Sequence, residues 1–332
     1  MTRRRDVITL FGGAAASSFL WPLAARAQQP GRMREIAIWM GRPNDAEGLR
    51  HATAFREGLA ALGWTVGRNI RTDYHWVTGD IDRTRMAREI IERKPELIVV
   101  ETTVGVAALA VQTRAIPMIF VNVSDPVGSA FVANLARPGG NITGFMSNEP
   151  TLGGKWPGLL KEIAPDVVRI GLMFNPDTAP YAPAFVSEAV TSGRSLGVEV
   201  AAAHVRNDGD IEQAIAAVAS TAGGGVIVLP ESTTNARYEV IIAASARHRV
   251  PAIYAYRYQA TGGGLIAYGV DNADLFRSAA GYVDRILRGE KPAELPVQAP
   301  TRFRLVVNLV TAKTLGLSVP ATLLATADEV IE

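Results

Sequence analysis

The fold is decided by the stretch Pro117-Met-Ile-Phe-Val-Asn-Val-Ser-Asp-Pro-Val-Gly-Ser-Ala-Phe-Val-Ala-Asn-Leu-Ala-Arg-Pro-Gly-Gly-Asn-Ile-Thr-Gly144. Its first part, residues 118–123, is an apolar run between two prolines. Such a run is typical of a strand that is buried on both faces of a parallel sheet. Polar side chains, Ser124 and Asp125, follow where this strand ends, and Pro126 favours a turn there. Ligands of open parallel sheets bind beyond the carboxyl ends of the strands, so both residues are candidate ligand contacts.

Units of one strand followed by one helix recur on both sides of this stretch. Strands are predicted over residues 35–40, 69–76, 97–100, 118–123, 142–145, 169–174, 198–205, 226–229, 251–254, 265–268 and 303–307. Helices are predicted over 47–62, 80–93 with Asp80 as cap, 104–111, 156–163, 184–196, from 208 or 210 to 221, 235–248, 272–287 and 309–315. The pattern predicts an α/β fold in which each half forms its own doubly wound parallel sheet.

Two lobes joined by a three-passage hinge are expected from the order of these units. About 305 residues remain after the first 27, a length that usually divides into two domains. The chain is expected to pass between the lobes near residues 144–150, 268–271 and 296–301. The predicted first lobe comprises 31–146 and 270–297, and the predicted second lobe comprises 147–269 and 298–332.

Residues 1–27 have the pattern of a signal peptide. A basic segment, Arg3-Arg4-Arg5, precedes an apolar segment over 10–23 and an A-x-A cleavage motif at Ala25-Arg26-Ala27. The arginine pair favours the twin-arginine export route. An uncleaved membrane anchor is the alternative, but the apolar segment is short and rich in Gly and Ala. The chain has no cysteine, which excludes a lipid anchor and disulfides, so a soluble periplasmic protein is expected.

The charge balance gives no sign of nucleic-acid binding. The whole chain has 34 basic and 32 acidic residues. Residues 1–27 contain four of the basic and one of the acidic residues, which leaves 30 and 31 in the mature chain. A net charge near −1 offers no electrostatic footprint for a polyanion. We therefore expect no nucleic-acid partner. The expected partner is a small molecule, and the expected state is a monomer.

The sequence contains no constellation that would indicate an enzyme. There is no cysteine nucleophile and no G-x-S-x-G motif. The four histidines, His51, His75, His204 and His248, are scattered without metal-ligand spacing. We therefore expect no catalytic residue, no metal and no cofactor. An exported α/β enzyme remains the least favoured alternative.

A ligand site is expected where the predicted strands end. The helix N-terminus at Thr102 and Thr103 favours a carboxylate. Glu231, Asp125 or Asp271 suits an ammonium, and Tyr254 or Tyr256 suits stacking. Several of these side chains have a structural alternative as helix caps, turn formers or hinge residues. The candidate ligand contacts are Gly41, Thr102, Thr103, Ser124, Asp125, Asn175, Tyr181, Glu231, Tyr254, Tyr256 and Asp271.

The chain also resembles a known family. The opening stretch, the segment Phe55-Arg-Glu-Gly-Leu-Ala-Ala-Leu-Gly-Trp64 and the segment Ala280-Gly-Tyr-Val-Asp-Arg-Ile-Leu-Arg-Gly-Glu-Lys-Pro292 are similar to ABC-transporter substrate-binding proteins of the tryptophan/tyrosine-binding type. The resemblance extends to 327–332. It implies the type I periplasmic binding protein fold, with ligand contacts after the third strand, at the Ser-Asp-Pro turn and at the strand ends of the second lobe.

The resemblance also implies a function. It predicts the periplasmic binding component of an ABC importer, which captures a small polar solute such as an amino acid or an analogue. Closure of the two lobes would precede delivery to a permease in the inner membrane. A periplasmic sensor, which would present the same fold to a membrane receptor, is the alternative.

Overall fold

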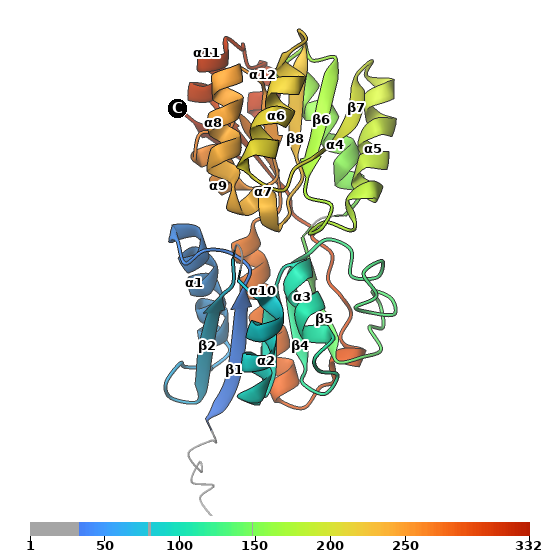
Figure 1. The fold of residues 1–332 in the computed structure, drawn as a ribbon. Coiled ribbons are helices and arrows are strands. Elements are labelled where there is room, and N and C mark those ends of the chain that lie inside the picture. The colour runs from blue at the N-terminus through green and yellow to red at the C-terminus, as the bar shows by residue number, and fades with distance from the viewer. Residues whose placement is uncertain (1–32, 79–80, 148) are drawn as a thin grey trace, which may run out of the picture. The chain divides into compact units, whose positions relative to one another are not determined.

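The computed structural model describes residues 33–78, 81–147 and 149–332; the predicted signal peptide and the predicted cap Asp80 lie outside these residues. The first lobe contains a five-stranded sheet in the order β2-β1-β3-β4-β5, and all its pairs are parallel (Figure 1). Its strands are β1 (Arg34–Met40), β2 (Ile70–Trp76), β3 (Leu97–Glu101), β4 (Met118–Val123) and β5 (Ile142–Met146).

The second lobe contains a seven-stranded sheet in the order β12-β11-β10-β9-β8-β6-β7. Its strands are β6 (Arg169–Phe174), β7 (Glu199–His204), β8 (Gly224–Val228), β9 (Ala252–Tyr254), β10 (Ile266–Gly269), β11 (Arg304–Asn308) and β12 (Glu329–Ile331). Strand β11 pairs antiparallel with β10, whereas the other pairs are parallel. The predicted α/β fold with two wound sheets is confirmed, and the reversal at β11 is the departure from a purely parallel sheet.

Helices cover both faces of each sheet. In the first lobe they are α1 (Ala46–Ala61), α2 (Arg83–Glu92), α3 (Thr103–Ala110) and α10 (Asn272–Leu287), with the 3-10 turn η1 (Pro292–Glu294). In the second lobe they are α4 (Thr151–Ile163), α5 (Ala182–Ser195), α6 (Asp208–Ala219), α7 (Ser232–Ala236), α8 (Tyr238–His248), α9 (Arg257–Thr261), α11 (Leu309–Leu315) and α12 (Ala321–Thr326).

Successive side chains of each strand point to opposite faces of the sheet, so each sheet has one apolar core on each face. In β1, Ile36 and Ile38 face α1 and α10, while Ala37 and Trp39 face α2 and α3. The strands are apolar at successive positions because both faces are covered. Each large apolar side chain buried in this way contributes about 1.5–3 kcal/mol to folding. In the second lobe, α4 and α5 cover one face, and α6 and α8 cover the other.

Helix α10 belongs to the first lobe although it follows the strands of the second. Its residues Phe276, Ala279 and Val283 are fully buried in the same core as β1, β3 and β4. Figure 1 shows α10, in orange, beside α1 and the strands of the first lobe. The chain therefore passes between the sheets after β5, after β10 and before β11. Backbone hydrogen bonds of Gln298 with Gly144 and Met146 join two of these passages.

Some local predictions differ from the structure. The cap of α2 is Asp82, whose side chain accepts from the backbone N–H of Arg85. The predicted helix 235–248 is two helices, because Arg237 has a non-helical backbone between α7 and α8. The short elements α9, α12 and β12 were not predicted, because a few residues carry too little periodicity to be recognised.

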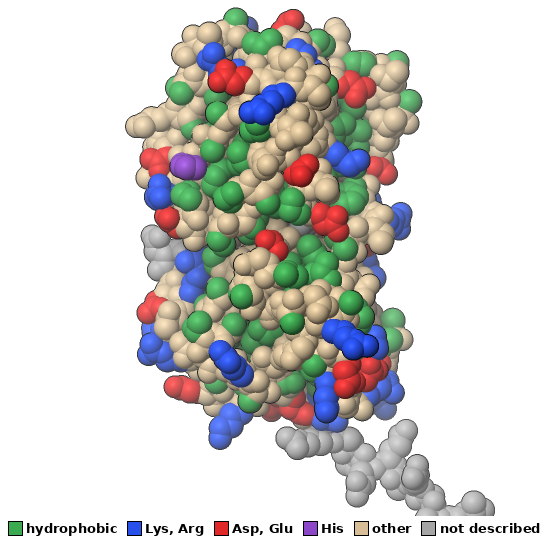
Figure 2. All heavy atoms as spheres, turned by 90° about the vertical axis from the view of Figure 1, so that its right-hand side faces the viewer, with side chains coloured by type: hydrophobic (Ala, Val, Ile, Leu, Met, Phe, Trp, Pro, Cys, Tyr) green, Lys and Arg blue, Asp and Glu red, His purple; other side chains and the backbone are tan. Residues whose placement is uncertain are grey.

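The surface of the described residues mixes the two signs of charge. On the face shown in Figure 2, basic and acidic side chains are interspersed with small apolar areas. Within the described part of the chain, no helix combines the length and apolar character that crossing a membrane requires. Among these same residues, no three His, Asp or Glu side chains gather as ligands for a metal ion.

Candidate functional site: two contiguous cavities lined by both lobes

Residues of both lobes line two cavities at the carboxyl ends of β1, β3 and β4. The inner cavity measures about 40 Å³ and is lined by Gly41, Arg42, Pro43, Asp45, Glu101, Thr102, Asn122, Asn235, Ala236, Tyr238, Tyr256, Tyr258 and Asn272. The outer cavity measures about 250 Å³ and is lined by Trp39, Gly41, Val77, Thr78, Arg83, Thr102, Val104, Asn175, Asp177, Thr178, Arg206, Ser232, Thr233, Ala236 and Arg237. Three residues line both cavities, which makes the two spaces contiguous: Gly41, Thr102 and Ala236.

Strained backbone marks the first-lobe wall of the inner cavity. Thr102 has φ 77° and Asn122 has φ 61°, although neither residue is glycine. A β-branched residue in this region is a conformational outlier, and such strain concentrates at functional sites. Gly41 makes room for Thr102, since a Cβ on Gly41 would lie 2.4 Å from Thr102 Cγ2. The conformation therefore depends on the pairing of Gly41 with Thr102.

An arginine and two tyrosines form a column across the inner cavity. The guanidinium carbon of Arg42 lies 5.0 Å from the centre of the Tyr258 ring, and that ring stacks on Tyr256 at 5.8 Å. Burial lowers the pKa of Arg42, but the interactions with Tyr258 and with the nearby carboxylates, Glu101 first, outweigh burial and raise it, so Arg42 stays cationic. The hydroxyl of Tyr256 donates to Asn122 Oδ1 at 2.8 Å, which links the second lobe to the first.

A buried carboxylate lies at the back of the inner cavity. Glu101 is 2% exposed, and its Oε2 accepts from the backbone N–H of Gly41 at 3.0 Å. Its Oε1 lies 3.8 Å from Nδ1 of the fully buried His51, which stacks on Phe276. The other ring nitrogen of His51 lies 3.2 Å from Glu47 Oε1.

This chain of charged groups continues away from the cavity. Burial raises the pKa of Glu47, but hydrogen bonds with His51 and Arg50 outweigh burial and lower it to about 2. Arg50 also donates to Asp271 Oδ1 at 2.7 Å. Asp271 caps α10 and lies 3.9 Å from Arg304 of β11. The ionic groups behind the site thus reach the passages between the lobes.

Four of the eleven predicted contacts line the cavities. Gly41 and Thr102 line both of them, Tyr256 lines the inner one, and Asn175 lines the outer one. The side-chain amide of Asn175 donates to Thr233 Oγ1 at 2.9 Å, which places two strand-end segments of the second lobe together.

Four other predicted residues, Thr103, Ser124, Asp125 and Asp271, line neither cavity. Thr103 is the buried first residue of α3, and Ser124 is 2% exposed. Asp125 accepts from the backbone N–H of Gly128 at 2.8 Å, as a turn former does. Asp271 lines a separate cavity that also contains Arg304.

The remaining three predicted residues are occupied within the second lobe. Glu231 is 4% exposed and caps α7 by accepting from the backbone N–H groups of Thr233 and Thr234. The hydroxyl of Tyr181 donates to the carbonyl of Pro230 at 3.0 Å. Tyr254 is 1% exposed and lies in the apolar core beneath α6 and α8. These contacts give the three residues structural roles, so the prediction that they face the ligand finds no geometric support.

Sequence reasoning missed Arg42, Asn235, Tyr258 and Asn272 as wall residues of the inner cavity. Arg42 directly follows Gly41, and Asn272 directly follows Asp271, so a signal was present one residue away in both cases. Asn235 and Tyr258 lie in short helices, and no strand-end pattern pointed to them.

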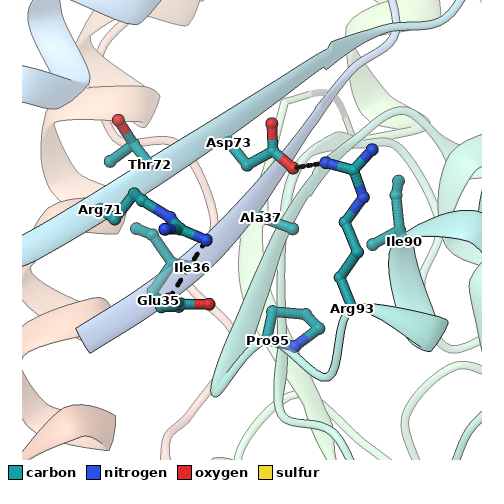
Figure 3. A pocket seen from close by; sticks show the side chains of 9 residues that line it. All are labelled: Glu35, Ile36, Ala37, Arg71, Thr72, Asp73, Ile90, Arg93 and Pro95. Atoms are coloured by element: carbon teal, nitrogen blue, oxygen red, sulfur yellow. Dashed lines mark hydrogen bonds and ion pairs between the residues drawn. The ribbon is translucent and has the colours of Figure 1, made fainter. Parts of the chain in front are cut away.

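A larger cavity of about 500 Å³ lies on the first lobe, away from the ends of the strands that form the site. Figure 3 shows its charged side chains directed toward one another rather than into open space. Arg71 pairs with Glu35 at 3.2 Å, and Arg93 pairs with Asp73 at 2.7 Å. All its lining residues come from one lobe, so lobe closure cannot enclose a ligand there.

Comparisons with known proteins give this site its context. Residues 45–331 match the family model described as ABC transporter substrate binding protein, and the chain therefore belongs to this family. A tyrosine-binding protein of Clostridioides difficile is 24% identical over 270 residues, which cover 79% of this chain and 75% of that protein. The family resemblance and the predicted role as the substrate-binding component of an ABC transporter are confirmed.

Two solved structures share the fold. A conserved domain protein of Vibrio cholerae has a TM-score of 0.83 at 28% identity, over 90% of this chain and all of the other. An ABC domain from Streptococcus pneumoniae, solved in complex with L-Trp, has a TM-score of 0.82 at 22% identity over the same shares.

Proposed function

We propose that this chain is the periplasmic binding component of an ABC importer. It captures a small polar solute, an amino acid or an analogue, between its lobes and delivers it to a permease in the inner membrane. The observation that carries this proposal is the pair of contiguous cavities, whose walls come from both lobes. A ligand held there stabilises the closed arrangement because it contacts both halves at once.

The chemistry of the walls supports a polar ligand. Arg42, whose side chain is 10% exposed, and the buried Glu101 provide one charge of each sign. Hydrogen-bonding groups come from Thr102, Asn122, Asn175 and Tyr256. A dissociation constant of about 1 μM corresponds to roughly −8 kcal/mol. A few charge-assisted hydrogen bonds of about 1.5–3 kcal/mol each supply that free energy. The amino-acid ligands named for two relatives favour the same class.

Export of the chain is part of the proposal. Residues 1–27 serve as a signal peptide of the twin-arginine type, and the mature protein acts as a monomer in the periplasm. The proposed lobes keep the predicted limits, 31–146 with 270–297 and 147–269 with 298–332. The passages between the two sheets, near Gln298 and the segments that it joins, support these limits.

Thermal unfolding with a panel of amino acids and small metabolites tests the proposal. A ligand present at roughly 100 times its dissociation constant adds about 2.7 kcal/mol to the free energy of unfolding. We expect at least one panel member to raise Tm by several degrees without being consumed. Mass spectrometry of protein purified from the periplasm identifies any ligand that the panel omits. Absence of a stabilising ligand in both experiments, or chemical turnover of the bound compound, would refute the proposal.

A further inference from the structure

Buried polar atoms that lack a hydrogen-bond partner occur in three residues that line the inner cavity. They are Nε of Arg42, Oδ1 of Asn235 and Oδ1 of Asn272. These atoms come from three separate elements: the loop after β1, helix α7 of the second lobe and the start of α10. Buried polar groups are nearly always paired, so a cluster of unpaired ones on one cavity marks the place of a polar ligand.

The unpaired atoms comprise both donor and acceptor types. The two amide oxygens accept hydrogen bonds, and the Glu101 carboxylate on the same cavity adds an acceptor that is negatively charged. An ammonium group has three donors, which matches these three acceptors. The Nε–H of Arg42 is a charged donor that suits a carboxylate. Contact between Arg42 and the ring of Tyr258 holds the guanidinium in place.

The position of these groups sets the orientation of the ligand. The inner cavity, about 40 Å³, is lined by the residues that suit the two charged groups of an amino-acid head group, whereas the outer cavity, about 250 Å³, offers the larger space for a side chain. Gly41 and Thr102 line both spaces, so a ligand atom beside them has access to each. The α-carbon of an amino acid joins an ammonium, a carboxylate and a side chain, and it fits this junction.

The outer cavity is rich in hydrogen-bond donors. Ten of its fifteen lining residues are polar or charged. Three are arginines, Arg83, Arg206 and Arg237. Arg206 pairs with Asp177, the single carboxylate of this wall, at 2.7 Å, and Arg237 pairs with Asp208 at 3.0 Å. Guanidinium groups donate and never accept. A site built to hydrogen-bond its ligand rejects an apolar group, because the polar groups of the wall are then left unpaired.

We propose that the inner cavity holds the ammonium of an α-amino acid between Glu101, Asn235 and Asn272. Arg42 then holds its carboxylate, and the outer cavity selects a side chain that bears acceptors, such as an acid or a primary amide. This inference rests on the proposed function and specifies its ligand. It differs from the ring-bearing amino acids named for two relatives.

Isothermal titration calorimetry with matched ligands tests the assignment. The probes are glutamate, glutamine, aspartate and asparagine, with phenylalanine and tyrosine as ring-bearing competitors. For the tightest of them, the N-acetyl derivative removes the ammonium and the carboxyl methyl ester removes the carboxylate. We expect an acid or amide side chain to bind at least about tenfold more tightly than either ring, and each head-group derivative to lose about tenfold or more.

Two variants locate the head group. Arg42→Gln is expected to weaken the free acid about tenfold or more but to affect the methyl ester little, because the ester has already lost that contact. Asn235→Leu is expected to weaken the amino acid more than its N-acetyl derivative. Arg114→Gln is the matched control, since Arg114 is exposed and lines neither cavity. Circular dichroism confirms that each variant is folded.

The outcomes separate this inference from the proposed function. A ring-bearing amino acid that binds most tightly overturns the selection by the outer cavity. A co-purified ligand without an amino-acid head group, bound equally well by Arg42→Gln and the natural protein, overturns the whole inference and leaves the importer role standing. A ligand-bound crystal structure with only water in the inner cavity also overturns it. Failure of every ligand, including anything co-purified, refutes the proposed function itself.

Discussion

Substitution Gly41→Ala tests the packing on which the site depends. The added Cβ would lie 2.4 Å from Cγ2 and 2.9 Å from Oγ1 of Thr102, and 3.2 Å from the carbonyl oxygen of Glu101. Thr102 cannot move freely, because its hydroxyl caps α3 by accepting from Gly105. Overpacking of this kind costs about 1–3 kcal/mol. Replacement of glycine by alanine also lowers the conformational entropy of the unfolded chain, which stabilises the folded protein by about 0.4–1 kcal/mol. The net loss in the free energy of unfolding is therefore about 1–2 kcal/mol.

Urea unfolding followed by circular dichroism measures this loss. The matched control is Gly281→Ala inside α10, where a Cβ would meet nothing within 4 Å. Because Gly281 carries only the helix-propensity penalty, its replacement is expected to stabilise the protein by about 0.5–1 kcal/mol. Gly41 lines both cavities, so Gly41→Ala is expected to lower the affinity for the ligand. Gly281→Ala is expected to leave this affinity unchanged.

A double-mutant cycle identifies the clash. Thr102→Ser removes the methyl group at 2.4 Å and keeps the capping hydroxyl, so it should relieve much of the cost of Gly41→Ala. We expect a favourable coupling of about 0.5–1.5 kcal/mol between the two substitutions. If Gly41→Ala costs the same stability with and without Thr102→Ser, the clash with Cγ2 is not the cause. If Gly41→Ala has the same free energy of unfolding as the natural protein, Gly41 and Thr102 are not closely packed.

Further predictions concern the electrostatics, the contact between the lobes and the core. The pKa of Glu47 is lowered from 4.5 to about 2, so its carboxylate stabilises the fold above about pH 4.5 and loses this effect as the pH falls toward 2. Glu47→Gln should therefore unfold at lower urea than the natural protein at pH 7, with a smaller difference at pH 3; a constant difference would contradict this. Tyr256→Phe removes the hydrogen bond to Asn122 and should weaken ligand binding about two- to tenfold by calorimetry, unless that contact is absent from the closed state. Leu160→Ala, at a fully buried position, should lower the free energy of unfolding in urea by about 2–5 kcal/mol. A loss below about 1 kcal/mol would mean that the second-lobe core relaxes into the space that the leucine side chain leaves.

The strands could be predicted from sequence because burial on both faces leaves a plain signal. The predicted strand at 118–123 has the same limits as β4, and the predicted helix at 272–287 has the same limits as α10. Neither the reversal of β11 nor the short elements near the C-terminus could be predicted in this way. Strand direction depends on which edge of the sheet is open when the chain returns, and no local pattern records that.

The site was predicted only in part, for a physical reason. The strand-end rule reached Gly41, Thr102, Asn175 and Tyr256, whose position follows from the parallel topology alone. The same rule also predicts Glu231, whose carboxylate accepts from the backbone N–H groups of Thr233 and Thr234 in α7 and which lines neither cavity. A carboxylate after a strand has the same sequence pattern whether it caps a helix or binds a ligand.

Completion of the first lobe by α10 has a consequence for the nascent chain. The strands of that lobe end with β5 at residue 146, yet α10, which covers one of their faces together with α1, begins at residue 272. While the ribosome makes the 125 residues between them, that apolar sheet face has only α1 to cover it. Self-association and chaperone capture compete during that interval. A stop codon before residue 272 would remove α10 from the first lobe. It would also remove β11 and β12 from the sheet of the second lobe, so neither lobe of the truncated product would be complete.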